Sequence, residues 1–276
     1  MRANGTSASR RVLARYLAAA RYKSKKTVKT ESGEDMVVYE YSDRQRALRD
    51  NSKARRLQKL RGNIRKLRER VRKDLASKDD KTRLTALCVA LMDATAERVG
   101  NFESREERGH VGVTGWQRKH VLIGPKKIRF KYRGKSGVDH IKELSDSELR
   151  AAVKAAYKAC GEDDEAGLLE YKDGRVTPEM ANDYLSEFGI TCKDLRGHSA
   201  NVSMIENLKQ VRRDGGDLPS EKTERAKLLK SEFQKALKLT AEHVGHEPAT
   251  LRSDYLVPNL EESYVSKGEI LERLDD

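Results

Sequence analysis

The chain has 276 residues, a length that accommodates one large domain or two small ones. It contains 57 Lys and Arg against 44 Asp and Glu, and its residues are 37% hydrophobic, 37% charged and 5% aromatic, which is typical of a solvated, helix-rich protein with a lean core. The longest uncharged apolar run, Leu84 to Met92, is too short to cross a bilayer, which excludes an integral membrane protein, and three cysteines without a CxxC pair favour a reducing compartment.

The positive charge is concentrated at the N-terminal end. Residues 1–80 contain 24 basic and 10 acidic residues, whereas the remaining 196 contain 33 and 34. A basic segment beside a near-neutral body most often binds a polyanion, because the release of condensed counterions favours phosphate binding; a solvated tail or a ribosome-surface extension is the alternative. Residues 1–30, with nine basic and no acidic residues, resemble an organellar transit peptide as much as a DNA-contacting arm, and we favour the arm.

The first predicted elements are a short strand and a basic helix. Residues 36–41 are β-prone and follow a turn. Over residues 44–75, apolar side chains recur every three or four positions among many Arg and Lys, which predicts a helix with one face that packs and one that can meet phosphates. We expect phosphate contacts from Arg61, Arg65 and Arg68 of this helix.

A second helix and a small sheet are predicted next. The helix has an apolar face from Leu84 onwards and is expected to end at Gly100-Asn101, with Arg98 at its C-terminal end. Residues 111–142 change to the alternating pattern of strands, with turn residues at 124–125 and 134–137. We interpret this region as an antiparallel sheet whose second hairpin carries Lys135 at its tip.

The remainder of the chain is predicted to be helical. Ser145 begins a Ser-x-x-Glu capping box, and Thr177 is an N-cap before proline. Long helices are expected over residues 193–213 and 220–243, and a tail helix over 261–274. The predicted fold class is therefore α+β, mostly α-helical with a small antiparallel sheet.

No familiar cofactor motif occurs in the sequence. His243-x-x-His246 lacks the glutamate and the spacing of a zinc-hydrolase helix, and there is neither a GxxxxGK[S/T] nor a GxGxxG motif after a strand. We therefore expect no cofactor and no metal. A scattered set of polar residues remains, namely Arg98, Lys135, Lys193, Arg196, His246 and Tyr255. Each alone has an ordinary explanation, such as an arginine that complements a helix dipole.

Taken in order, these residues resemble the active site of type IB DNA topoisomerases of the short, poxvirus-like and bacterial-like form, and more distantly that of tyrosine recombinases, which share the catalytic domain. The matching stretches are Arg98-Val-Gly-Asn101, Lys119-His-Val121, Tyr132-Arg-Gly-Lys135, Lys193-Asp-Leu-Arg196, Val244-Gly-His246 and Ser253-Asp-Tyr255-Leu-Val-Pro258. The resemblance covers about residues 37–265. It implies a catalytic set of Arg98, Lys135, Arg196, His246 and Tyr255, with DNA contacts from Lys193, Arg133 and Lys119.

The resemblance also implies the reaction and the domain organisation. A monomer would cleave one strand of duplex DNA through a 3′-phosphotyrosine, let the duplex swivel and religate it, without ATP or metal. Arginine and histidine side chains would bind the non-bridging oxygens, and Lys135 would protonate the departing 5′-oxygen. The implied domains are a basic arm (1–35), a truncated N-terminal domain with a vestigial strand and a linker helix (36–80), and the catalytic domain (81–276).

The sequence departs from the family pattern at Val111–Trp116, which stands in place of a Tyr-Gly-Thr-Thr-Leu-like strand, and at Gly197–Ala200 after the arginine box. Two alternatives remain. A site-specific tyrosine recombinase or integrase would need a C-terminal element that protomers exchange, for which residues 261–274 are the candidate. A non-enzymatic basic DNA-binding protein would need none of this chemistry. Lys193 favours the topoisomerase, since recombinases tend to have histidine there. We expect the chain in the cytoplasm or nucleoid, with the nucleus or a viral factory as alternatives.

Overall fold

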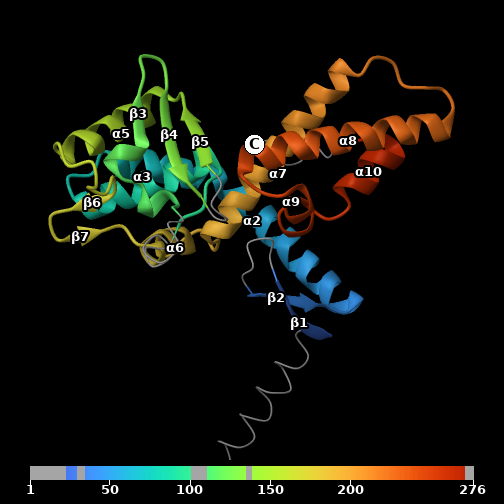
Figure 1. Ribbon diagram of the computed structural model, residues 1–276, viewed down its shortest axis with the longest axis horizontal. Helices are drawn as coiled ribbons and strands as arrows, with labels where there is room; N and C mark the ends of the chain where they lie inside the picture. Colours follow the sequence, from blue (N-terminus) through green and yellow to red (C-terminus); the bar gives the residue numbers. More distant parts are fainter. Residues whose placement is uncertain (1–22, 30–34, 101–110, 135–138, 271–276) are drawn as a thin grey trace, which may run out of the picture. The chain divides into compact units, whose positions relative to one another are not determined.

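The computed structural model describes residues 23–29, 35–100, 111–134 and 139–270 (Figure 1). The chain divides into two compact units, residues 1–55 and residues 56–276. The boundary falls within helix α2 (Asp43–Leu75). None of the helices in the described residues is both long and apolar enough to span a membrane.

The first unit contains a two-stranded antiparallel sheet and the start of α2. Strand β1 (Ser24–Lys29) pairs with β2 (Asp35–Glu40), with Ser24 opposite Glu40. Strand β2 confirms the strand expected over residues 36–41, whereas β1 was not expected. The start of α2 is capped reciprocally, because Gln45 N donates to Ser42 Oγ and Ser42 N donates to Gln45 Oε1.

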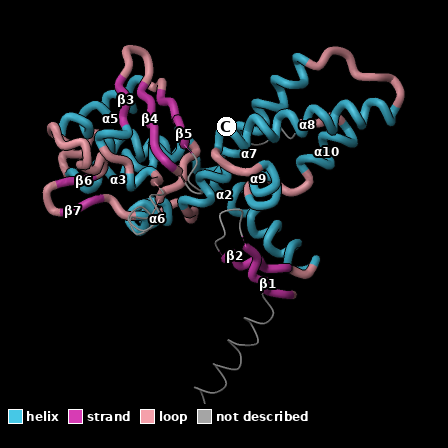
Figure 2. Tube along the Cα trace, in the orientation of Figure 1, coloured by secondary structure: helices cyan, strands magenta, loops and turns pink. Residues whose placement is uncertain are grey.

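The second unit contains the predicted three-stranded sheet, with strand order β3-β4-β5 and antiparallel pairing throughout (Figure 2). Its strands are β3 (Val121–Ile123), β4 (Ile128–Arg133) and β5 (Asp139–Leu144). In β4 the apolar positions 128, 130 and 132 are buried and the basic positions between them are exposed, as the alternation of the sequence predicts. A small hairpin pairs β6 (Glu170–Tyr171) with β7 (Gly174–Arg175), and two 3-10 turns, Val113–Gly115 and Arg118–His120, precede β3.

Helices make up most of the second unit, so the α+β fold class is confirmed. They are α3 (Asp80–Thr95), α5 (Ser147–Ala159), α6 (Pro178–Ser186), α7 (Cys192–Asp214), α8 (Lys222–Val244), α9 (Pro248–Asp254) and α10 (Leu260–Lys267). Helix α8 lies alongside α7, and α10 lies alongside α8 (Figure 1).

The structure corrects the predicted start of α5 and the predicted end of α10, and it confirms the predicted start of α6. The N-cap of α5 is Asp146 and not Ser145, because the Asp146 carboxylate accepts the hydrogen bond from Leu149 N. Helix α10 ends at Lys267, because Gly268 takes a left-handed conformation (φ 70°); residues 271–274 of the predicted tail lie outside the described residues. The N-cap at Thr177 is confirmed, with Met180 N donating to its hydroxyl.

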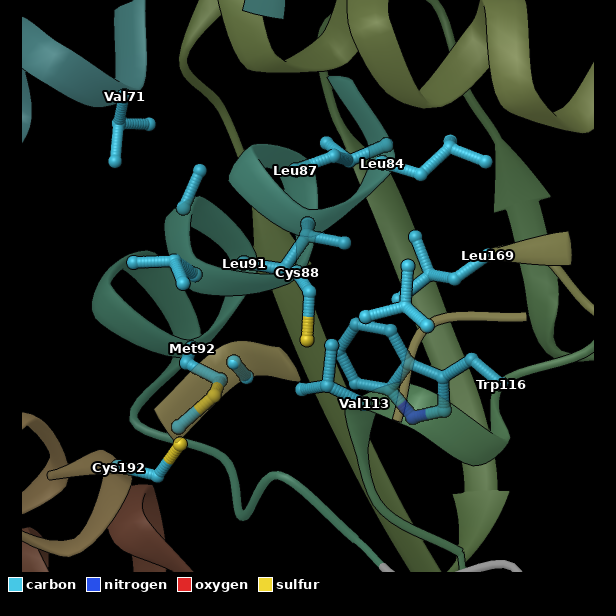
Figure 3. Packing of buried hydrophobic residues seen from close by; sticks show 14 of the residues in the cluster. Val71, Leu84, Leu87, Cys88, Leu91, Met92, Val113, Trp116, Leu169 and Cys192 are labelled. Atoms are coloured by element: carbon cyan, nitrogen blue, oxygen red, sulfur yellow. The ribbon is translucent and has the colours of Figure 1, made fainter. Parts of the chain in front are cut away.

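The described apolar side chains form two clusters. The first surrounds α3 and the three-stranded sheet, and Figure 3 shows the Trp116 indole facing Cys88 and Val113 within it. Trp116 also stacks on Phe130 with ring centroids 4.1 Å apart. The second cluster joins α8, α9 and α10 to the C-terminal part of α7, and it includes Ala96 from the end of α3. The candidate catalytic side chains come from the segments around Ala96 and from α7, α8 and α9.

Candidate active site

Arg98 lies beyond the end of α3, not in its last turn. The expectation that the helix reaches Gly100 was wrong, because Ala96 takes a left-handed conformation (φ 53°) and ends the helix at Thr95. The following main chain is fixed by backbone hydrogen bonds: Val113 N donates to Arg98 O at 2.9 Å. Gly100 (φ 90°) also lies against Gly112, where an added Cβ would be 2.5 Å from the Gly100 Cα. These contacts leave the Arg98 side chain half-buried.

Arg196 is the most buried of the candidate catalytic residues that the structure describes, with 3% of its surface exposed. It lies in the first turns of α7, whose N-cap Thr191 forms a capping box with Asp194. Its Nε donates to Ala96 O at 2.7 Å and its Nη2 donates to Val244 O at 2.6 Å. Burial first, and the charge of Arg98 second, lower the pKa of Arg196, but a guanidinium stays charged at neutral pH because its ordinary pKa exceeds 12.

His246 and Tyr255 follow α8 in a tight turn. Gly245 (φ 74°) ends α8, and His246 N donates to Ala241 O at 2.9 Å. Helix α9 (Pro248–Asp254) then follows, with Tyr255 as its C-cap. The rings of His246 and Tyr255 are 4.6 Å apart.

The four described catalytic candidates meet at one place. Arg98 Nη2 lies 3.3 Å from His246 Nδ1, and Arg196 Nη1 donates to the Tyr255 hydroxyl at 3.4 Å. Tyr255 is half-buried, and cationic groups of Arg196 and Lys193 lie near it. The structure thus brings together residues separated by more than half the chain.

Asn201 fixes the main chain around Tyr255, and the sequence analysis did not identify it. It is fully buried on α7, and its Nδ2 donates to Tyr255 O at 2.8 Å. Its Oδ1 accepts a hydrogen bond from Val257 N at 2.9 Å. One amide therefore holds the carbonyl of the candidate nucleophile and the amide two residues later. A polar residue on an apolar helix face was the available signal, because residues 197, 201, 204 and 208 share one face of α7.

A second unpredicted group lies behind the arginines. Glu97 is 2% exposed, and it accepts hydrogen bonds from the Tyr132 hydroxyl and, at 2.8 Å, from Arg98 N. Lys142 of β5 is 5% exposed; its ammonium lies 3.8 Å from Glu97 Oε2 and donates to His243 O. Burial, and then the Glu97 charge, raise the pKa of Tyr132, which keeps it a neutral donor.

Lys135 lies outside the described residues. The described ends of its hairpin, Arg133 and Asp139, are paired across β4 and β5. Among the predicted DNA contacts, Lys193 is exposed at the N-terminal end of α7, with its ammonium 6.0 Å from the Tyr255 ring centroid. Arg133 is exposed, and Lys119 forms an ion pair with Glu165 at 2.5 Å.

The three arginines predicted on α2 do not join this site. Arg65 is exposed and lies 3.8 Å from Glu69. Arg68 makes a two-armed ion pair with Asp93, at 2.8 and 3.3 Å, and lines a pocket of about 420 Å³ between α2, α3, α7 and α8. Arg61 is partly buried. Their role in phosphate contact stays a prediction.

The electrostatics of the site suit an anion. The cationic side chains of Arg98, Arg196 and Lys142 outnumber the one carboxylate with which they interact, that of Glu97, so the cluster carries net positive charge. Two guanidiniums offer paired donors to the oxygens of a phosphate, next to a phenol that can act as a nucleophile. Within the described part of the chain, no three His, Cys, Asp or Glu residues come together as a metal-binding group.

Comparisons with known proteins identify related sequences. The family model for the eukaryotic DNA topoisomerase I catalytic core matches residues 42–267. DNA topoisomerase 1 alpha of Arabidopsis thaliana is 29% identical over 175 residues, which cover 62% of this chain and 18% of that protein. DNA topoisomerase I of Monkeypox virus is 27% identical over 171 residues, which cover 62% of this chain and 50% of that protein. The chain therefore spans half or less of the length of these two curated relatives.

Among solved structures, a post-cleavage complex of the XerH site-specific recombinase with its palindromic difH substrate is similar. It aligns with a TM-score of 0.45 and 15% sequence identity, covering 87% of this chain and 60% of that chain.

Proposed function

The chain belongs to the family of the eukaryotic DNA topoisomerase I catalytic core, and from this premise we propose that it relaxes supercoiled duplex DNA by transient cleavage of one strand. The observation that carries the proposal is the contact of Arg196 with the Tyr255 hydroxyl beside the Arg98–His246 pair. A phosphodiester seated there would have a nucleophile on one side and charged donors around its oxygens.

The arginines and the histidine would bind the phosphate. Arg98 and Arg196 donate charge-assisted hydrogen bonds to non-bridging oxygens, and His246 adds a third donor. Their charge counters the negative charge that builds up as the phosphorus becomes five-coordinate, and this is the larger part of the expected rate enhancement. Arg196 is well suited to this role because two main-chain carbonyls already fix its guanidinium.

Tyr255 would supply the nucleophile. A bond forms between its phenolic oxygen and phosphorus, the bond from phosphorus to the 5′-oxygen breaks, the phenol loses its proton and the departing oxygen gains one. Lys135 is the proposed donor of that proton, a step worth about 10²–10⁴-fold for general acids. The 3′-phosphotyrosine retains the energy of the broken bond, so the reverse attack by the 5′-hydroxyl reseals the strand without ATP.

The docking of α10 favours a topoisomerase acting as a monomer over a recombinase. Tyr264 of α10 is fully buried against α8 of the same chain, and its hydroxyl donates to Glu232 Oε2 at 2.6 Å. Glu232 also accepts from Arg212 of α7 at 2.5 Å. A recombinase would require this element to leave its own chain for a partner, which would expose Tyr264 and break that network.

The deciding experiment is incubation of the protein with supercoiled plasmid in EDTA without ATP, with part of the reaction quenched in detergent. We expect relaxation and a covalent protein–DNA adduct. Tyr255→Phe should bind duplex DNA with unchanged affinity and form no adduct. Adduct formation by this variant would show that another residue is the nucleophile, and an absence of both activities in the wild type would refute the proposal.

A second experiment tests Lys135 as the proton donor. Lys135→Ala should slow cleavage of an ordinary phosphodiester by about 10²-fold or more and bind DNA normally. A substrate with a 5′-thiolate leaving group needs no proton, so it should largely hide the defect. An equal defect on both substrates would remove Lys135 from the acid role.

A further inference from the structure

Arg98 and His246 lie in two stretches of chain that are far apart in sequence. Arg98 follows α3, and His246 follows α8. Their side-chain nitrogens are 3.3 Å apart, at a position where both would have to contact one phosphate. The spacing of the two stretches is set by side chains that contact both.

Arg196 joins the two stretches once. Its Nε and Nη2 bind Ala96 O and Val244 O, one carbonyl from each stretch. This leaves its Nη1 for the Tyr255 hydroxyl.

Lys142 joins the same two stretches a second time. Its ammonium donates to His243 O, three residues before His246. It also lies 3.8 Å from Glu97 Oε2, while Glu97 Oε1 accepts from Arg98 N at 2.8 Å. We propose that Lys142, acting through Glu97, is a positioning residue that sets the spacing of Arg98 and His246 for strand cleavage. This role rests on the proposed function.

Stability alone does not account for a buried ion pair at this position. Removing two charges from water is costly, and replacement of a buried pair by apolar residues is often neutral or stabilising. Lys142 is further opposed by the charges of Arg98 and Arg196, and burial is the main reason why its pKa falls to about 8. A lysine in these surroundings is explained by its two specific contacts, not by its contribution to folding.

Protonation of Lys142 should therefore control the geometry of the site. The titratable and charged groups around it are Glu97 and Arg98 after α3, Arg196 on α7, His243 on α8, and His140 and Tyr132 in the sheet. Burial lowers the pKa of His140 and raises that of Tyr132, so neither changes charge near pH 8. Burial also lowers the pKa of His243. Loss of the lysine proton near pH 8 should weaken the contact with Glu97.

The test compares the wild type with Lys142→Met and with the isosteric Glu97→Gln. We would measure single-turnover adduct formation from pH 6.5 to 9.5 on a 5′-thiolate substrate, which removes the proton demand of the leaving group. Lys142→Met should be slower by about 10- to 100-fold near pH 7, with the dissociation constant for DNA within about twofold. The ratio of the wild-type rate to the variant rate should shrink as the pH rises through 8, because the wild type then loses the same charge.

The controls separate the outcomes. Lys154→Met removes an exposed lysine of α5 and should leave rates and affinity unchanged. If Lys142→Met does not fold, Glu97→Gln should show the same pH-dependent ratio. A double variant should be no slower than the worse single variant, since the two residues act as a unit. Equal rates for the wild type and Lys142→Met, or a ratio constant with pH, would overturn this role while adduct formation by the wild type upholds the proposed function. A wild type that forms no adduct would refute both.

Discussion

Arg98 and Tyr255 are held in the site by two different kinds of contact. The main chain near Arg98 is fixed by backbone hydrogen bonds to residues 113 and 114 and by the approach of Gly100 to Gly112. Besides backbone hydrogen bonds to Leu251 O, the main chain near Tyr255 is fixed by one side chain: Asn201 donates to Tyr255 O and accepts from Val257 N. A new Cβ at Gly112 would disrupt the first arrangement. The second adds one buried side-chain amide to its backbone hydrogen bonds.

The largest effect should come from Arg196, because it belongs to both regions. Arg196→Lys keeps the charge, but one ammonium cannot bind two carbonyls and also face the Tyr255 hydroxyl. We expect single-turnover cleavage to slow by about 10³-fold, with DNA binding retained. Arg213→Lys, at the exposed end of α7, is the matched control. A loss of less than tenfold would mean that this guanidinium does not contact the reacting phosphate.

Next in size is the effect of Gly112→Ala on stability. The new Cβ would lie 2.5 Å from Gly100 Cα and 2.8 Å from Arg98 O, both main-chain atoms that cannot rotate away. We expect the free energy of unfolding in urea to fall by about 2–3 kcal/mol. Gly62→Ala on α2 is the control, because nothing lies within 4 Å of its added Cβ; it should be neutral or stabilising. Similar values for the two variants would contradict the close approach.

Asn201→Ala should act on cleavage more than on folding. The change leaves Tyr255 O and Val257 N without the amide partner that now holds them, so the nucleophile loses its fixed position. We expect adduct formation to slow by about 10- to 50-fold, about 2 kcal/mol, with unchanged DNA affinity. Asn201→Asp keeps the acceptor for Val257 N but places a carboxylate oxygen against the carbonyl oxygens of Gly197 and Tyr255, so it should lose at least as much. A wild-type cleavage rate in Asn201→Ala would show that α9 alone fixes Tyr255.

The smallest effect is the pH dependence that Lys142 gives to stability. Its ordinary pKa of 10.5 is lowered to about 8 on folding, so between these values the unfolded chain binds more protons. The free energy of unfolding should therefore rise with pH above about 8, by about 1 kcal/mol between pH 7.5 and 9. The difference between the wild type and Lys142→Met in urea denaturation measures this contribution. A difference that does not change with pH would mean that Lys142 keeps its ordinary pKa.

Signals between residues close in sequence predicted most of the helices and strands. Thr177 followed by Pro178 marks a helix start in sequence and in structure, because a hydroxyl N-cap and a proline in the first turn act within a few residues. The alternation of β4 and the length of α7 were also predicted, because the spacing of apolar residues is likewise a local signal. Strand β1 was missed because its sequence, SKKTVK, has little of the apolar character of a strand.

The finer geometry of the site could not be predicted, because it depends on partners distant in sequence. Helix α3 ends at Thr95 where Arg196, a hundred residues away, binds the carbonyl of Ala96. The sequence around Lys142 is that of a polar strand and predicts a solvent-exposed lysine, whereas in the structure its ammonium lies near Glu97. The family resemblance gave the candidate catalytic residues, but it gave no reason to single out Glu97, Lys142 or Asn201.

The hydrogen bond from Asn201 to the Tyr255 carbonyl would affect the movement of a cleaved DNA strand. A nucleic acid end attached to Tyr255 would be tied to main chain that α7 holds on both sides. That DNA end would move little. The torsional strain of the DNA duplex would therefore be released only by rotation of the other end, which is not attached to the protein. The accuracy of religation would then depend on how well the buried Asn201 amide keeps the attached DNA end in a fixed position.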